Sequence, residues 1–309
     1  MTGASVDSTP TSKFQPDTAM ASSDFFQRFY FESLGIRGEI VRLNESWKQT
    51  QGLTRYPAPV AALLGESLCA TVLLSGTIKF QGSLILQIQS GGPVKTIVAQ
   101  TTHQRTVRGL AHWAPDLDTQ NFQQLLPDGR LVITIQNQNH EPYQGIVSVD
   151  GTSIADTLES YFRQSEQLPT RLWLDADSEL ATGIFLQILP EKERLEDDWN
   201  RILHLTDTLT REELRELPSE ELLYRLYNEE DVRIIEPEPV LFRCSCDRER
   251  IETVLLTLGS DEIVDVLSRE GAIEVHCDFC NRLYRFDKVD IGALYNDKAT
   301  LRHPHPSHH

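Results

Sequence analysis

Cys-Ser-Cys at residues 244–246 and Cys-Asp-Phe-Cys at residues 277–280 are two short motifs, thirty residues apart, that decide how the C-terminal part of this chain folds. Side chains at i and i+2 of an extended strand point to the same face, so the first motif presents both sulfurs to one point. The second motif flanks a tight turn of the kind that grips a metal. Because thiolates select zinc or an iron–sulfur cluster, we expect one Zn²⁺ per reduced chain. Its predicted ligands are Cys244, Cys246, Cys277 and Cys280.

A complete tetrahedral shell of four thiolates leaves no open position for a substrate or a water, so this zinc is not expected to be hydrolytic. The same thiols could also close on each other, because Cα atoms two residues apart in a strand are about 6.6 Å apart, near the upper limit for a disulfide. Nearby positive charge favours thiolates, and five arginines surround the cysteines in sequence. A redox role and an inert structural zinc therefore both stay open. These arginines are Arg243, Arg248, Arg250, Arg282 and Arg285.

Composition limits the possible partners and the compartment. The formal net charge of the 309 residues is −17, which argues against a surface that binds nucleic acid. No run of about 18 apolar residues predicts a membrane span, and residues 1–23 show no secretory signal. We therefore expect a cytoplasmic protein without a membrane partner, in a compartment where thiols stay reduced.

The predicted fold class is α+β. Residues 1–23 are expected to be a disordered tail, and residues 24–190 a domain in which a mixed sheet packs on helices. Cys69 falls inside an almost uniformly apolar helix and is expected to be a small buried hydrophobe. The expected strands include 36–43, 77–89, 131–136 and 180–189, and the two strong helices span 57–74 and 153–165.

Residues 191–239 form a strongly acidic segment that we expect to be a helical linker. It carries sixteen acidic and seven basic residues, yet apolar residues recur along it with roughly helical spacing. Pro218 is expected to begin a new helix, and Glu-Pro-Glu-Pro at 236–239 to act as a semi-rigid joint. The apolar stripe could dock permanently on the first domain or be uncovered at times.

Residues 240–294 are expected to be a small α+β zinc-binding domain. Asp247 can cap a helix that runs to Leu258, a second helix runs from Ser260 to Arg269, and residues 273–276 alternate as a strand that leads to the second motif. A domain of this size depends on its metal, because structural zinc adds about 10–16 kcal/mol of apparent binding free energy. Residues 295–309 are expected to be a disordered, histidine-rich tail.

The cysteine motifs, read with their neighbours, resemble the zinc centre of the heat shock protein 33 family, the 33 kDa chaperonins. Leu-Leu-Gly-Glu at 63–66, Lys-Phe-Gln-Gly-Ser-Leu at 79–84 and Tyr-Gln-Gly-Ile-Val at 143–147 are similar to the N-terminal domain of that family, as is the segment 161–170. The resemblance covers residues 25–294.

The resemblance implies a redox-regulated, ATP-independent holdase rather than an enzyme. It implies a reduced, zinc-bound, inactive form and disulfides between near neighbours, Cys244 with Cys246 and Cys277 with Cys280, whose formation releases the zinc. It further implies homodimers that bind unfolding client proteins and hand them to ATP-dependent foldases. Candidate client-binding residues lie in the linker: Leu195, Trp199, Ile202 and Leu209.

Two other classes of protein remain as alternatives. One is a constitutive zinc-stabilised scaffold or regulatory protein, which would gain no binding activity on oxidation. The other is an enzyme of the N-terminal domain, although its polar candidates form no recognisable motif. These candidates are Glu66, His103, His112 and Glu166.

Overall fold

The computed structural model describes residues 24–52, 54–138, 140–190, 196–258 and 260–301. Most of this chain builds two six-stranded sheets, and a two-stranded hairpin lies near the C-terminal end. The strands are β1 (Phe25–Phe31), β2 (Ile36–Leu43), β3 (Gly82–Gln89), β4 (Val94–Thr102), β5 (Thr106–Trp113), β6 (Arg130–Asn137), β7 (Tyr143–Ser148), β8 (Thr170–Ala176), β9 (Ala181–Ile188), β10 (Arg233–Ile234), β11 (Glu238–Pro239), β12 (Leu241–Phe242), β13 (Ala272–His276) and β14 (Leu283–Asp287).

The helices connect and cover these sheets. The predicted α+β class is confirmed. The helices are α1 (Glu45–Gln51), α2 (Ala58–Gly76), α3 (Phe122–Leu125), α4 (Ile154–Tyr161) with a π-helical turn at Phe162–Glu166, α5 (Glu196–Thr206), α6 (Arg211–Glu216), α7 (Ser219–Tyr227), α8 (Arg248–Leu255), α9 (Ser260–Glu270) and α10 (Lys288–Leu301).

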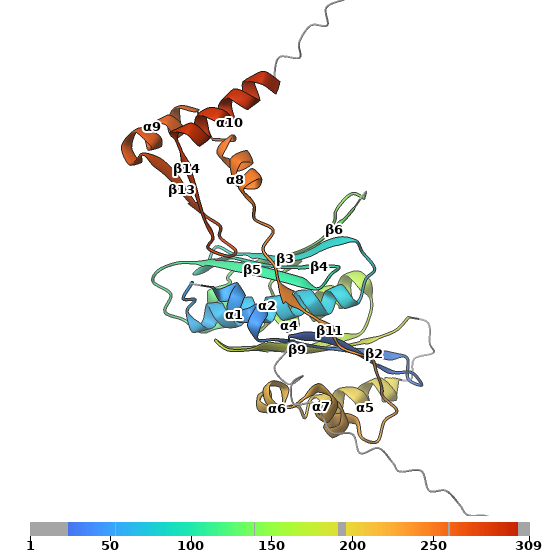
Figure 1. Cartoon of the computed structure of the whole chain (residues 1–309). Coiled ribbons are helices and arrows are strands. Elements are labelled where there is room, and N and C mark those ends of the chain that lie inside the picture. Colours follow the sequence, from blue (N-terminus) through green and yellow to red (C-terminus); the bar gives the residue numbers. More distant parts are fainter. Residues whose placement is uncertain (1–23, 53, 139, 191–195, 259, 302–309) are drawn as a thin grey trace, which may run out of the picture.

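The two large sheets enclose a layer of helices (Figure 1). The first sheet has the strand order β10-β1-β2-β9-β8, with β11 also paired to β1, and the second has the order β12-β5-β4-β3-β6-β7. Helix α2 lies between the sheets and contacts strands of both. It begins directly after Pro57, and fourteen of its nineteen residues are buried, because a helix covered on both sides has no polar face.

By length and composition α2 could cross a membrane, contrary to the expectation from the sequence, but 78% of its apolar window is buried inside the protein. Its side chains form the centre of the main hydrophobic core. Cys69 belongs to this core and is 0% exposed, as predicted for a small buried hydrophobe. Burial raises the pKa of the Cys69 thiol well above its ordinary value, so this cysteine is protected from ionisation.

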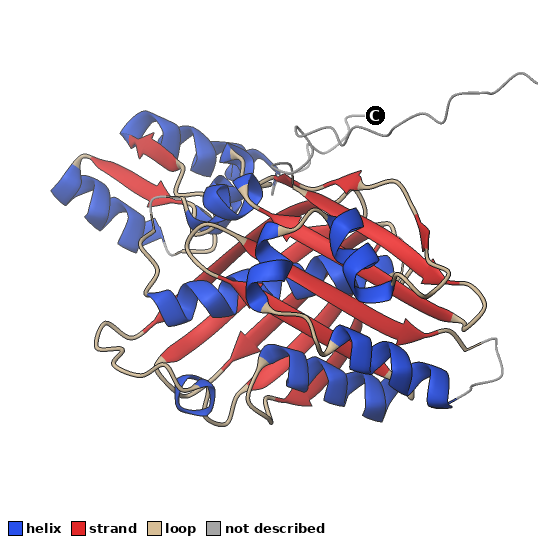
Figure 2. Cartoon of the chain, turned by 90° about the horizontal axis from the view of Figure 1, so that it is seen from below, coloured by secondary structure: helices blue, strands red, loops and turns tan. Residues whose placement is uncertain are grey.

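The acidic linker forms the outermost layer, helices α5 to α7, against the outer face of the first sheet (Figures 1 and 2). Strand β9 is buried at all eight positions, because α2 covers one of its faces and the linker helices cover the other. Pro218 directly precedes α7, as predicted, and Thr210 begins α6 with a capping box that includes Glu213.

Several expectations about local structure were wrong. Residues 295–301, expected to begin a disordered tail, belong to helix α10, whereas the expected tails at 1–23 and 302–309 lie outside the described residues. Residues 77–89 are not one strand: α2 continues to Gly76, and β3 begins only at Gly82, because Ile78 and Phe80 pack on the core from a turn. Residues 236–239, expected to act as a semi-rigid joint, include β11, which pairs with β1. Pairing at a sheet edge, where prolines are tolerated, therefore attaches this segment to the first sheet.

The segment after β12 forms a small separate layer on the second sheet (Figure 1). As predicted, the Asp247 side chain caps α8 by accepting from the Arg250 amide, and Gly271, with φ +77°, ends α9. Helix α8 ends earlier than Leu258. Six buried side chains form the core of this layer: Leu255, Ile263, Leu267, Ile273, Phe286 and Ile291.

Candidate metal centre

The four cysteines of the two motifs come from two separate backbone segments. The first pair lies in the extended stretch between β12 and α8, and the second in the turn of the β13–β14 hairpin. That turn is closed by the Asn281 amide, which donates to the Cys277 carbonyl at 2.7 Å, and by the Cys277 amide, which donates to the Arg282 carbonyl at 3.0 Å. Asn281 has φ 55°, a left-handed conformation that asparagine tolerates well.

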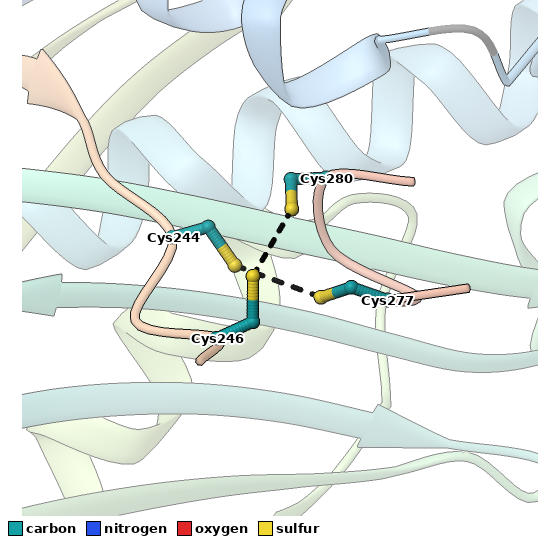
Figure 3. Close-up of side chains that lie close together, drawn as sticks. All are labelled: Cys244, Cys246, Cys277 and Cys280. Atoms are coloured by element: carbon teal, nitrogen blue, oxygen red, sulfur yellow. Dashed lines mark hydrogen bonds between the residues drawn. The ribbon is translucent and has the colours of Figure 1, made fainter. Parts of the chain in front are cut away.

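The four sulfurs point toward one another (Figure 3) and all lie within 4.8 Å of each other. The Sγ atoms of Cys244 and Cys277 are 3.7 Å apart, and those of Cys246 and Cys280 are 3.4 Å apart. Zn–S bonds of about 2.3 Å place the sulfurs of a regular tetrahedron about 3.8 Å apart. The cluster therefore has the donor set and the dimensions that a zinc ion requires.

One sulfur of the cluster has a hydrogen-bond donor outside the motifs. The Tyr284 hydroxyl donates to Cys246 Sγ at 3.2 Å. Partial burial opposes ionisation of Cys246, but hydrogen bonds from Tyr284 and from the neighbouring thiols lower its pKa to about 7. Burial and hydrogen bonds with the other three cysteines raise the pKa of Cys280. The sequence carried no signal for the contact of Tyr284 with Cys246.

The five arginines near the motifs do not all face the cysteines. Arg248 forms ion pairs with Glu252 at 3.0 Å and Asp290 at 2.8 Å, and Arg285 lies 3.7 Å from Glu274. A hydrogen bond with Tyr284, together with the nearby Cys246 and Cys280 sulfurs, raises the pKa of Arg282. Arg250 donates to the Ser245 carbonyl and hydroxyl oxygens, both at 2.8 Å, inside the first motif. Arg248 and Arg285 thus pair with carboxylates, whereas Arg250 contacts the motif itself.

The cysteine cluster lies against the second sheet, and this contact was not predicted. Arg108 on β5 donates from Nη1 to Ser245 Oγ at 2.8 Å, and its guanidinium lies 4.2 Å from the centre of the Phe279 ring. One side chain of the sheet thus touches both motifs. His112, also on β5, lies 3.9 Å from Asp278. The signal was invisible in the sequence, because more than a hundred residues separate the partners.

The predicted client-binding residues of the linker are covered. Ile202 is 0% exposed, and Trp199 and Leu209 are half-buried against the same core, which includes strands of the first sheet. Leu195 lies outside the described residues. The apolar stripe is therefore closed in this state of the protein.

The polar residues considered for an enzyme occupy different elements. Glu66 lies on α2, and burial raises its pKa to about 7. Glu166 accepts a hydrogen bond from Tyr161 at 3.1 Å in the π-helical turn. His103 follows β4 directly, and His112 lies near the C-terminal end of β5. In the part of the chain that the structure describes, these four side chains therefore do not form one site.

Comparison with known proteins identifies the family. The family model described as Hsp33 protein matches residues 24–287. The chain is 52% identical over 280 residues to the 33 kDa chaperonin of Nitrosococcus oceani. This match covers 91% of this chain and 97% of that protein. It is 42% identical over 279 residues to the 33 kDa chaperonin of Vibrio cholerae, with 89% and 96% covered.

A solved structure shows the same fold. The crystal structure of the 33 kDa chaperonin from Thermotoga maritima superposes with a TM-score of 0.77 at 24% identity, and the match covers 89% of this chain and 99% of that one. The sulfur cluster, the fold and the two close relatives lead to the same conclusion. This chain belongs to the Hsp33 family of 33 kDa chaperonins.

Proposed function

We propose that this protein is a redox-regulated, ATP-independent holdase of the cytoplasm, and not an enzyme. The observation that carries the proposal is the four-sulfur cluster, which joins two segments of a layer with only a small core of its own. Zn²⁺ held by Cys244, Cys246, Cys277 and Cys280 stabilises that layer in the reduced state.

Oxidation removes all four ligands in this proposal. Each near-neighbour disulfide, Cys244 with Cys246 and Cys277 with Cys280, forms when two zinc-bound thiolates lose two electrons. One peroxide per disulfide accepts these electrons together with two protons from the solvent and gives two waters. The two sulfur contacts described at 3.7 Å and 3.4 Å both run between the motifs, from Cys244 to Cys277 and from Cys246 to Cys280. Near-neighbour disulfides remove the metal that joins the two segments, which couples oxidation to unfolding of the segment 240–294.

Unfolding next to the linker opens its apolar side in this proposal. The segment 191–239 binds unfolding clients through the face that includes Leu195, Trp199, Ile202 and Leu209, while its many carboxylates keep the complex in solution. The segment 24–190 serves as the stable platform. The active form is a homodimer that hands its clients to ATP-dependent foldases.

Zinc content, thiol content and client aggregation test the proposal together. The reduced protein is expected to contain one zinc, without nitrogen in its coordination shell by X-ray absorption, and to leave a heat-unfolding client to aggregate. After peroxide treatment the zinc should be released, one of five thiols should remain, and aggregation should be suppressed. Equal suppression before and after oxidation would instead support a constitutive zinc-stabilised scaffold.

A further inference from the structure

The segment of residues 233–242, here called the edge strap, runs along one edge of each large sheet. It contains β10 and β11, which pair antiparallel with β1, and β12, which pairs parallel with β5. In Figure 1 it is the orange chain that rises past the sheets toward α8. Strands β1 and β5 would both be open edges without it, so the edge strap closes two rows of backbone hydrogen-bonding groups.

Few backbone hydrogen bonds attach the edge strap and the residue that follows it. Pro237 and Pro239 have no N–H group to donate, and each of the three strap strands has only two residues. Strands β1 and β2, in contrast, pair over seven residues. In addition to the pairing of these short strands, the strap side donates bonds from Ile235 to the Arg28 carbonyl at 2.9 Å, from Val240 to Asp24 at 3.1 Å, from Leu241 to Arg105 at 3.1 Å and from Arg243 to Val107 at 3.0 Å.

Two side chains hold the middle of the edge strap. Val240 is 1% exposed and belongs to the main core, so it fills a small apolar site between β1 and β5. Glu238 forms ion pairs with Arg28 and with Arg105, the latter at 3.2 Å. Glu236, two residues earlier, is exposed and has no side-chain partner among the described residues.

The edge strap is also connected directly to the metal centre. Arg243 donates to β5, and Cys244 is the next residue. Loss of the metal therefore frees the C-terminal end of the edge strap, and opening of α5 to α7 frees its other end. Strands β7 and β8 lie at the opposite edges of the two sheets and do not pair with the edge strap. Release of the strap therefore exposes the edges of β1 and β5 and leaves the edges of β7 and β8 as they are.

We propose that the edges of β1 and β5, once the edge strap leaves them, bind an extended segment of an unfolding client by strand addition. This inference rests on the proposed function and adds a second binding surface to it. Backbone hydrogen bonds recognise any extended chain, and the site that Val240 vacates favours one aliphatic side chain. Such binding suits clients that share no sequence but expose unpaired strands.

A labelled peptide with the sequence of residues 233–243 tests the proposal by fluorescence anisotropy. It should bind the oxidised, zinc-free protein and not the reduced, zinc-loaded protein. Methylating the peptide nitrogen at the position of Leu241, whose N–H bonds to β5, should weaken binding roughly tenfold, because about 1.4 kcal/mol is lost with a hydrogen bond and a clash. The matched control carries the methyl group at the position of Phe242, which donates no described hydrogen bond to β5, and should bind within about twofold of the unmodified peptide.

Equal weakening by both methyl groups would overturn strand addition as the mode of binding. Oxidised protein that suppresses client aggregation but binds no strap peptide would overturn this inference and leave the proposed function standing. Oxidised protein that fails to suppress aggregation would contradict the proposed function itself.

Two variants test whether the peptide and the edge strap compete for the same edges. Glu238→Gln removes both ion pairs of the strap and should raise the affinity of the oxidised protein for the peptide several-fold. Glu236→Gln makes the same chemical change at a position without a partner and should leave the affinity unchanged. Equal affinity in the two variants would overturn competition at these edges.

Discussion

At the scale of single residues, Glu39 on β2 carries a fully buried carboxyl group. It is 0% exposed, and neither carboxylate oxygen has a hydrogen-bond partner among the described residues. Burial raises the pKa of Glu39 to about 8, although Arg37, Arg105 and Arg28 oppose this shift. Between its ordinary pKa and this value, the folded protein binds a proton that the unfolded chain has lost. Glu39 therefore makes the fold less stable as the pH rises through that range.

Replacing Glu39 with Gln should remove this pH dependence. At pH 5 the carboxyl is neutral in the fold, so Glu39→Gln should be about as stable as the parent. From pH 5 to 8 the parent should lose up to ~1.4 kcal/mol per pH unit relative to the variant. Urea unfolding of the reduced protein at pH 5, 7 and 9 measures the difference. Glu45→Gln, on the surface, is the control, and parallel pH profiles for parent and Glu39→Gln would refute the assignment.

Arg108 is the single side chain of the second sheet that is described in contact with both cysteine motifs. Its hydrogen bond to Ser245 and its contact with the Phe279 ring are each worth about 0.5–1 kcal/mol. Arg108→Gln should therefore speed zinc transfer from the reduced protein to a coloured chelator roughly five- to thirtyfold. Arg130→Gln, exposed on β6 of the same sheet, should transfer zinc at the parental rate. Identical rates in the two variants would show that docking on β5 does not stabilise the centre.

At the scale of elements, α5 to α7 are amphipathic helices that depend on the first sheet for their stability. Short helices are marginal in water, and most of their stability comes from packing of an apolar face. Their buried residues, which include Ile202, Leu214 and Leu226, share one core with β1, β2 and β9. The linker helices are therefore expected to unfold readily once the adjoining segment 240–294 has unfolded.

Trp199 on α5 should report that reversal. It is half-buried in the reduced state, so oxidation with zinc loss should shift its emission to longer wavelengths and raise its quenching by acrylamide. The measurement is the difference between the parent and Trp199→Phe. Removing the other tryptophans is less suitable, because the Trp47 indole donates to the Asp177 carbonyl at 2.7 Å inside the protein. A difference spectrum that oxidation leaves unchanged would show that α5 stays docked.

At the scale of the whole molecule, the thiols divide into a cluster of four and a single core residue. The four clustered cysteines lie in the small layer that follows β12 and contacts the second sheet, here called the outer layer. Cys69 lies in α2 between the sheets. The two locations differ in the size of the hydrophobic core that surrounds the cysteines. The core of the outer layer has six buried apolar side chains, whereas Cys69 belongs to the main hydrophobic core around α2. In the proposed function, the metal contributes to the stability of the outer layer, whereas Cys69 is held by apolar packing alone.

Removing two ligands should separate unfolding from disulfide formation. Cys277→Ser/Cys280→Ser should lower zinc content well below that of the parent and give partial client binding even when reduced, since the outer layer loosens. It should respond little to peroxide, because the second disulfide cannot form. Cys69→Ala should keep a nearly full oxidant response. Aggregation assays on a heat-unfolding client decide the outcome, and full activation of the double variant by oxidant would contradict the switch.

The sequence by itself determined the features that depend on neighbouring residues. The Cys-x-Cys and Cys-x-x-Cys spacings specified which sulfurs converge, Pro57 and Asp247 marked where α2 and α8 begin, and the apolar stripe of residues 191–239 predicted its helices. Capping, helical periodicity and turn chemistry act within a few residues, so they can be read along the chain.

Only the tertiary structure decided which surfaces meet. The enclosure of α2 by two sheets, the closure of β1 and β5 by the edge strap, and the approach of Arg108 to the cysteines all join residues far apart in the chain. Tyr284 on β14 contacts Cys246, which lies in the extended stretch between β12 and α8. Such contacts depend on strand order and register, which follow from burying all apolar faces together and have no local signature.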